Sequence, residues 1–338
     1  MNNSVTCCAS YQDVAPAYAK INLHLGIYPH NVGESGYHRA DSVMAALELA
    51  DMVTLSYNER AQQNTVVMDA GPDVPMKDNT AFRALEAMCQ TFHKQPAYTV
   101  TIQKHIPAQA GLGGSSSDAA TTIKLLCKFW GIDALDARVV RVAQSIGADV
   151  AFFLQPIPAY LNGVGATLQE SFEHVPSIPC VIVRPQAGVS TPVAYRLFDE
   201  YVQAEAEAKS RLELKIQPEL SQELRSELNP EAGIQSFMPQ SPDRIIQALR
   251  AGDVLTLNEL LYNNLAEAVI HHVADIREVL AWLRVQQGIS HPCVTGSGSA
   301  VFAFAQSSAI CDEIAQKASK MRNWWVYSTK TLGLNCVF

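Results

Sequence analysis

The sequence predicts an α+β protein of two domains, and two observations lead to that prediction. The chain has 338 residues, more than one domain usually holds, and 48% of them are hydrophobic, which is ample for a buried core. Strand-like and helix-like stretches alternate before residue 110, whereas the C-terminal part combines helices and strands in a way that suits one antiparallel sheet covered by helices. We therefore expect an N-terminal domain at residues 1–170 and a C-terminal domain at residues 171–338.

The N-terminal half begins with an alternating strand at residues 14–28. Apolar residues occupy positions 21, 23, 25 and 27, and the positions between them carry a polar set that includes Lys20 and Asn22. Such alternation is typical of an antiparallel strand with one face in solvent. The next expected elements are a strand at 51–57, a short strand at 65–69, an amphipathic helix at 79–93 and a strand at 98–104.

A glycine- and serine-rich loop at residues 107–120 follows that strand and leads into a helix that runs to about Trp130. Three glycines lie within four residues, at 111, 113 and 114, and serines open the helix. Glycines let backbone N–H groups approach an anion without a Cβ in the way, and a helix N-terminus adds unpaired donors and the positive end of its dipole. The pattern therefore predicts a phosphate-binding loop, with an ordinary loop and a Ser N-cap as the alternative.

Two common phosphate-loop types do not fit this loop. The Walker pattern requires a Lys-Ser or Lys-Thr pair after the glycines, which the chain lacks. The dinucleotide-binding spacing also fails, because Ser116 stands where its third glycine would be. The loop is therefore a phosphate site of another kind, or none.

A single carboxylate, Asp149, follows a helix expected at residues 136–146 and ended by Gly147. It stands directly before the apolar run 150–154, which we interpret as strand-like. An aspartate in such a place is usually a cap or a turn former. It can also be a catalytic base, provided that a cation nearby favours its ionised form.

The C-terminal half carries a second glycine- and serine-rich loop at residues 295–299. A helix is expected to begin with Thr191 as its N-cap and Pro192 as its first residue, because threonine is favoured at the N-cap and proline at the first helical position. The charge-rich stretch 199–229 is typical of an exposed helix. Further expected elements are a hairpin at 159–168, a strand at 180–185, three helices between 242 and 287, a strand at 301–304, a helix at 308–321 and a strand at 324–332.

Charge and cysteine content narrow the class of protein. A net charge of −8, without runs of Lys or Arg, disfavours a general surface for nucleic acid or for anionic membranes. The eight cysteines form no C-x-x-C pair, which favours reduced thiols over a disulfide framework or a zinc site. The first residues show no signal-peptide pattern, and no segment approaches the ~20 apolar residues of a membrane span. We therefore expect a cytoplasmic enzyme.

Four pieces of the chain, in this order, resemble motifs of the GHMP small-molecule kinases, which include galactokinase and the homoserine, mevalonate and phosphomevalonate kinases. The likeness extends from about residue 15 to the C-terminus. It implies a two-domain fold with an N-terminal ribosomal-protein-S5-domain-2-like nucleotide domain and a C-terminal ferredoxin-like substrate domain. The pieces are residues 19–23, 107–120, 147–150 and 295–299.

The resemblance also implies the reaction. The first motif, the triplet Gly36-Tyr37-His38 and residues 147–150 are most similar to the family branch that phosphorylates the 2-hydroxyl of a cytidine-diphosphate-linked methylerythritol in the non-mevalonate isoprenoid pathway. ATP would be the phosphoryl donor, with Mg²⁺, and the protein would be a monomer or a weak homodimer. A kinase for another small alcohol, such as homoserine or a mevalonate derivative, and a non-catalytic binding protein of the same family stay open as alternatives.

Site residues follow from the same likeness. Asp149 would be the general base, which agrees with the need of an alcohol for a proton acceptor, and Lys20 its cationic neighbour. Ser115 and Ser116, with Ser117 beside them, are candidates for magnesium contact. The resemblance implies ATP contacts at Asn79, Lys104, Pro107, Ala108, Gln109, Ala110, Gly111, Leu112, Gly113, Gly114, Ser115, Ser116 and Ser117. It implies acceptor contacts at Asn22, Tyr37, His38, Asp149, Thr191, Tyr195, Gly296 and Ser297, with Tyr37 and Tyr195 stacking on the cytosine.

Overall fold

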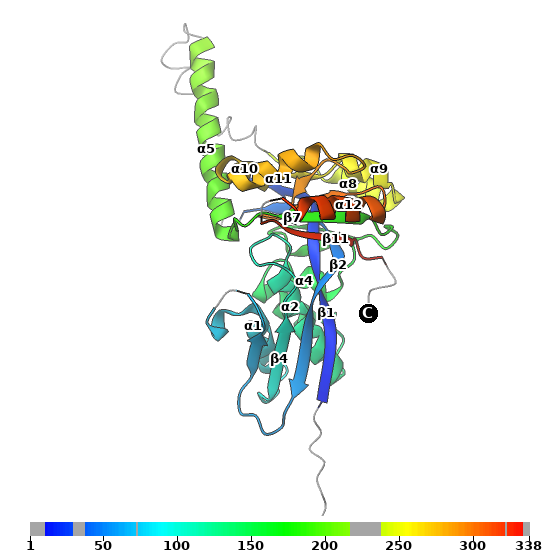
Figure 1. Cartoon of the computed structure of the whole chain (residues 1–338). Helices are drawn as coiled ribbons and strands as arrows, with labels where there is room; N and C mark the ends of the chain where they lie inside the picture. The colour runs from blue at the N-terminus through cyan, green and yellow to red at the C-terminus, as the bar shows by residue number, and fades with distance from the viewer. Residues whose placement is uncertain (1–10, 30–37, 72–73, 217–237, 322, 334–338) are drawn as a thin grey trace, which may run out of the picture.

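Two long strands connect the halves of the molecule. The structure is a computed structural model and describes residues 11–29, 38–71, 74–216, 238–321 and 323–333, without the side chains of residues 209–216. Strands β1 (Tyr11–Ile27) and β2 (Ala40–Tyr57) form an antiparallel pair that extends from the N-terminal half into the C-terminal half (Figure 1). The strand predicted at 51–57 is therefore the second part of a longer strand.

The N-terminal sheet is built around that pair. Its other strands are β3 (Thr65–Met68), β4 (Tyr98–Gln103), β5 (Ala159–Asn162), β6 (Thr167–Ser171) and β8 (Tyr262–Asn263). The main path runs β3-β4-β2-β1-β8, while β5 pairs with β2 and with β6. Because β8 comes from the C-terminal half and pairs in parallel with β1 at His24 and Leu25, the halves share this sheet. The division at residue 170 stays a prediction.

The expectation that one face of β1 lies in solvent is wrong. Lys20, Asn22 and His24 are only 4%, 3% and 2% exposed. On the other face, Ile21 and Leu23 pack in the core between the halves, together with residues of β7 and β10, which are described below. The second half of β1 is thus covered on both faces, and buried polar side chains need internal partners.

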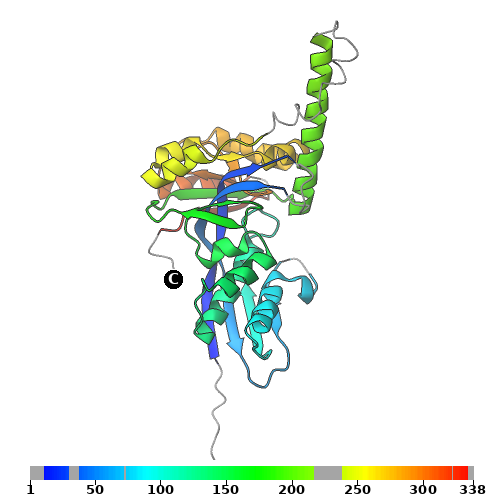
Figure 2. The same ribbon diagram turned by 180° about the vertical axis from the view of Figure 1, so that it is seen from behind.

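One face of the N-terminal sheet is covered by helices. These are α1 (Thr80–Thr91), preceded by the 3₁₀ turn η1 (Met76–Asp78), α2 (Gly114–Trp130), α3 (Ala137–Ile146) and α4 (Val150–Leu154). Figure 2 shows α2, α3 and α4 in front of the strands. The helices predicted at 79–93 and 136–146 are confirmed, as is the helix predicted to run from the serines to about Trp130, which begins at Gly114; Asn79 and Asp136 cap α1 and α3. The strand predicted at 150–154 is wrong: a short, wholly apolar run does not distinguish a buried strand from a buried helix, and Phe152 and Phe153 pack as part of α4.

The C-terminal half has the expected antiparallel sheet covered by helices. Its order is β11 (Trp325–Lys330), β7 (Pro179–Arg184), β10 (Val301–Phe304), β9 (Cys293–Val294), and every pair is antiparallel. Four helices rather than the predicted three lie between residues 242 and 287 in the described part of the chain. Besides α5 (Thr191–Ile216), the helices of this half among the described residues are α8 (Asp243–Ala251), α9 (Val254–Glu259), α10 (Leu265–His272), α11 (Ala274–Arg284) and α12 (Ser308–Ala318).

Helix α5 (Thr191–Ile216) projects beyond the body of the protein (Figures 1 and 2). The Ser190 carbonyl accepts the first helical hydrogen bond, from the Ala194 N–H, at 3.0 Å. The N-cap is therefore Ser190, and the predicted cap at Thr191 is one residue late. Tyr195 and Phe198 pack in the C-terminal core. The part of the predicted exposed helix beyond residue 216 lies outside the described residues.

Candidate active site

A cavity of about 810 Å³ lies between the two halves. The N-terminal half contributes β1, the glycine loop and the starts of α1 and α2, and the C-terminal half contributes the loop after β9 and the start of α5. Ser117 and His38 do not line the cavity, and Tyr37 lies outside the described residues. The predicted residues that do line it are Lys20, Asn22, Asn79, Lys104, the run 107–116, Asp149, Thr191, Tyr195, Gly296 and Ser297.

The glycine loop is pressed against the second glycine- and serine-rich loop. Gly111 has φ +76°, and a Cβ built on it would lie 2.0 Å from the Thr295 carbonyl oxygen. The N–H groups of Ser299 and Ala300 donate to the carbonyls of Gln109 and Ala110, at 3.3 and 3.1 Å. Glycine is therefore needed at position 111 both for its conformation and for the close approach of two backbones.

The glycine loop ends at the N-terminus of α2. Gly113, with φ +72°, is the N-cap residue of this 17-residue helix. The first N–H groups of an α-helix have no partner within the helix and lie at the positive end of its dipole. Because Gly113, Gly114, Ser115 and Ser116 all line the cavity, the helix start is turned toward it. This geometry suits a bound phosphate.

Lys20 and Asp149 meet in this cavity. The Lys20 Nζ lies 3.6 Å from the Asp149 Oδ2, with the lysine side chain 4% exposed and the aspartate 33% exposed. Asp149 is the N-cap residue of α4, yet its side chain makes no capping hydrogen bond, so the carboxylate is available to the cavity. Cβ atoms at Gly113 and Gly296 would lie 3.0 Å from the Lys20 Cγ and 3.3 Å from its Nζ. The lysine is thus held between the two glycine loops.

Asn22 holds the Lys20 ammonium in place. Its Oδ1 accepts a hydrogen bond from the Lys20 Nζ at 2.7 Å, and its Nδ2 donates to the Ser42 Oγ at 2.9 Å. Its backbone N–H donates to the Thr295 Oγ1 at 3.1 Å. Since donor and acceptor atoms of the amide are both engaged, the Asn22 side chain has one orientation, and it connects Lys20 to the C-terminal half.

The far side of the cavity carries the residues predicted to contact an acceptor. Thr191 and Ser297 approach through their hydroxyls at 3.4 Å, at the start of α5. The Tyr195 ring lies 5.0 Å from the His38 ring at an interplanar angle of 40°. Burial, and secondarily the charge of Asp149, raise the pKa of Tyr195 to about 12, so its hydroxyl is neutral at physiological pH. The two aromatic residues therefore lie side by side, with Tyr195 reaching the cavity.

Asp199 was not predicted as a site residue. Its Oδ1 lies 2.7 Å from the His38 Nε2. It stands four residues after Tyr195, and this spacing places both on one face of a helix, which was the signal available in the sequence.

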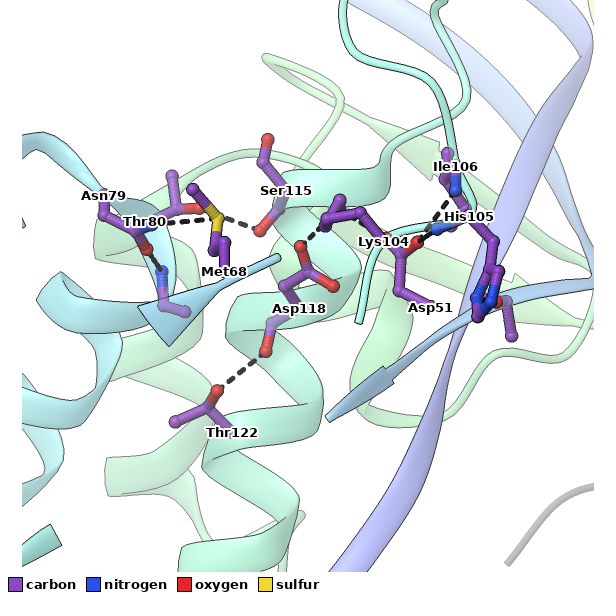
Figure 3. Close-up of polar contacts among 12 residues, drawn as sticks. Asp51, Met68, Asn79, Thr80, Lys104, His105, Ile106, Ser115, Asp118 and Thr122 are labelled. Carbon is purple, nitrogen blue, oxygen red and sulfur yellow. Dashed lines mark hydrogen bonds and ion pairs between the residues drawn. The ribbon is translucent and has the colours of Figure 1, made fainter. Parts of the chain in front are cut away.

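The residues predicted on the adenosine side have structural contacts of their own. The Asn79 Oδ1 caps α1 by accepting from the N–H groups of Ala81 and Phe82, at 2.9 and 3.2 Å. The Lys104 ammonium donates to two carboxylates that sequence reasoning missed, Asp51 and, at 2.7 Å, Asp118 (Figure 3). Burial raises the pKa of the Asp118 carboxyl, against the attraction of Lys104. Burial alone would lower the pKa of Lys104, but the two carboxylates outweigh it and raise that pKa.

The three serines at the start of α2 differ in their surroundings. Ser115 is exposed and Ser116 is half-buried, and both line the cavity, whereas Ser117 is 1% exposed and does not line it. The described residues contain no group of three or more His, Cys, Asp or Glu side chains placed to hold a metal ion. They also contain no helix with the length and apolar character needed to cross a membrane.

Comparison with known proteins gives one family for both halves. Residues 79–155 match the family described as GHMP kinases N terminal domain, and residues 245–322 match GHMP kinases C terminal. The chain is 33% identical over 317 residues to the 4-diphosphocytidyl-2-C-methyl-D-erythritol kinase of Desulfitobacterium hafniense (strain Y51), covering 94% of each chain. A kinase of the same name from Prosthecochloris aestuarii is 31% identical, over 90% of this chain and 92% of that relative.

Solved structures resemble the chain over nearly its whole length. A crystal structure of 4-(cytidine 5'-diphospho)-2C-methyl-D-erythritol kinase superposes with a TM-score of 0.69 at 26% identity, covering 95% of this chain and 100% of the other. Homoserine kinase from Cytophaga hutchinsonii has a TM-score of 0.63 at 15% identity, covering 98% and 97%. At 15% identity, the likeness to homoserine kinase shows a shared fold only.

Proposed function

This chain belongs to the GHMP kinase family, and from that premise we propose that it transfers the γ-phosphoryl group of ATP to the 2-hydroxyl of 4-diphosphocytidyl-2-C-methyl-D-erythritol. Family and α+β fold class, both predicted from the sequence, are confirmed. The observation that carries the activity is the Lys20–Asp149 ion pair, 3.6 Å across, beside the glycine loop. The acceptor is taken from relatives that match this chain over nine-tenths of its length or more.

Asp149 would accept the proton of the attacking hydroxyl. An alcohol is a weak nucleophile until its proton has an acceptor within hydrogen-bond reach. The Asp149 carboxylate is one-third exposed and is not used to cap α4, so an acceptor hydroxyl can reach it. As the oxygen bonds to the γ-phosphorus, the bond to the departing ADP breaks and the hydroxyl proton passes to the Asp149 carboxylate.

Lys20 would stabilise the charge that develops during that transfer. In phosphoryl transfer, catalysis is mostly positioning and electrostatic stabilisation. The Lys20 ammonium is fixed by Asn22 and by the two glycine loops, which are groups of the protein itself. A preorganised charge of this kind needs little reorganisation during the reaction.

ATP would bind with its phosphates on the glycine loop and the start of α2. The residues present also suit Mg²⁺, because this ion keeps several waters and is usually held by few protein groups together with the substrate phosphates. Ser115 and Ser116 are the hydroxyls that would hold it, since both line the cavity. When bound, Mg²⁺ neutralises phosphate charge.

The acceptor would lie against α5 and the loop after β9. Tyr195 offers an aromatic face to the cavity, and His38 supports that ring from the side. Thr191, Gly296 and Ser297 line the same wall and would contact the polar parts of the acceptor. The expected cytoplasmic location and the monomer or weak homodimer stay predictions.

A coupled assay of ADP release tests this function. The purified chain is given ATP and Mg²⁺ with the cytidylated methylerythritol, homoserine or mevalonate as separate acceptors. We expect ADP release above background with the cytidylated compound only. Equal or faster release with homoserine or mevalonate would favour the alternative of another small-alcohol kinase. ADP release at background level with all three acceptors would contradict the proposed function.

A further inference from the structure

A buried ion cluster lies under the first turn of α2 and has no part in the chemistry above. Asp51 is fully buried, Asp118 is 3% exposed, and the Lys104 side chain between them is 13% exposed. Figure 3 shows the Lys104 side chain reaching the carboxylates of both aspartates. Lys104 follows β4, Asp51 lies in β2 and Asp118 lies in α2, so three elements meet at one ammonium group.

The cluster joins the two ends of the glycine loop. Lys104 precedes the loop and Asp118 lies in α2, the helix that follows it, so their 2.7 Å hydrogen bond brings the two ends of residues 105–117 together. The Asp51 Oδ1 also accepts the backbone N–H groups of His105 and Ile106, the latter at 2.8 Å. The start of the loop is therefore fixed to β2, and its end is fixed to the same lysine.

The cluster also touches the helix turn that would face the phosphates. A Cβ added to Gly114, the first residue of α2, would lie 3.5 Å from the Lys104 Nζ. On the outer side of that turn, the Thr80 hydroxyl donates to the Ser115 carbonyl at 2.8 Å. The orientation of the first turn of α2 is thus set by contacts from Lys104, which follows β4, and from Thr80 in α1.

The charges of the cluster do not explain its place beside an anion site. One ammonium faces two carboxylates, so the cluster brings no net positive charge toward a triphosphate. Its contribution must then be geometric: it fixes the backbone whose N–H groups bind the phosphates. Buried ion pairs often add little to net stability, which agrees with a role in fixing geometry.

We propose that Lys104 is a positioning residue for the nucleotide. It acts through Asp118 and Asp51, by holding the two ends of the glycine loop together, rather than by contacting ATP. The proposal rests on the proposed function for the identity of the nucleotide. If the proposal is right, Asp118 is as important for ATP binding as Lys104, and the two residues act as one unit.

The test measures ATP binding to the full chain by calorimetry, without an acceptor. Asp118→Leu is the principal variant because it leaves Lys104 paired with Asp51. It should weaken ATP binding roughly 10-fold, the effect expected from the loss of one charged hydrogen bond that holds a binding loop. Lys104→Met should weaken it by at least as much, and the double variant should be no weaker than Lys104→Met alone. Asp118→Asn keeps an oxygen for Lys104 and should retain most of the affinity.

Two further readouts separate positioning from loss of fold. The melting temperature of each variant reports stability, and amide hydrogen exchange at residues 108–116 reports the order of the loop. That order should decrease in Asp118→Leu without a matching change in α3. Lys128→Met is the matched control, because Lys128 is an exposed lysine on the same helix that also pairs with an aspartate, Asp13. This variant should bind ATP as the wild type does.

The outcomes that overturn the proposal are distinct from failure of the proposed function. If Lys104→Met loses affinity while Asp118→Leu binds ATP normally, Lys104 acts by direct contact and the proposal is wrong. Additive losses in the double variant would contradict it as well. If instead the wild-type chain binds no ATP, the proposed function itself fails, which no comparison among variants would mimic.

Discussion

Replacing Gly111 by alanine tests whether the two glycine loops must touch for the enzyme to work. A Cβ at this position would lie 2.0 Å from the Thr295 carbonyl oxygen and 3.1 Å from the Gly298 nitrogen. The clash is with backbone on the facing loop, so no side chain can turn away to relieve it. The loops must separate.

The size of the effect follows from that distance. Ordinary van der Waals contact begins at 3.4 Å, so the loops must move apart by 3.4 − 2.0 = 1.4 Å. Lys20 is held between the same loops, and a misplacement of ~1 Å at a reacting centre can reduce the rate about 100-fold. The left-handed backbone at φ +76° adds a stability loss of about 1 kcal/mol.

Gly131→Ala is the matched control. Gly131 ends α2 with φ +67° and has open space around its Cβ position, so the variant carries the same backbone penalty without a clash. Steady-state kinetics with the cytidylated methylerythritol and thermal denaturation are measured for both variants. We expect both to melt earlier, and only Gly111→Ala to lose kcat/KM by about 100-fold. Wild-type kcat/KM in Gly111→Ala would refute the reasoning.

Three other variants test separate parts of the site. Tyr195→Leu should raise KM for the acceptor several-fold with kcat and ATP affinity nearly unchanged, and an unchanged KM would remove the tyrosine from the acceptor site. Thr295→Val removes the hydroxyl that accepts the Asn22 N–H and should lower kcat more than it changes either KM. A lower kcat that is fully accounted for by a lower melting temperature would indicate a structural role only. Asn79→Ala should destabilise the fold by about 1 kcal/mol through the lost cap of α1, as measured by urea unfolding, whereas a stability equal to the wild type would contradict that cap.

The sequence predicted well those parts of the molecule that local chemistry determines. The glycine loop opening α2 and the helices around it follow from residue type and spacing, and the structure contains them. The run after Asp149 was misjudged because an apolar stretch of five residues fits a buried strand and a buried helix equally well, and only packing decides.

Burial and long-range pairing were the parts that the sequence could not supply. The polar face of β1 looked solvated, yet Lys20 and Asn22 are buried, and the loop that contacts Asn22 lies 273 residues later in the chain. The partners of Lys104 were missed for the same reason: its ammonium pairs with Asp51, 53 residues earlier, and with Asp118, 14 residues later, while its predicted ATP contact stays a prediction. Partners at such separations are fixed by the fold, not by local pattern.

The central claim is that Asp149 takes the proton from the acceptor beside Lys20, and Asp149→Asn tests it most directly. Asparagine keeps the size of the side chain but cannot accept the proton as a carboxylate does. The account predicts that kcat with the cytidylated methylerythritol falls by at least the ~10²–10⁴-fold typical of acid–base catalysis, while ATP affinity measured by calorimetry stays within about twofold. Turnover at the wild-type rate in this variant would contradict the account.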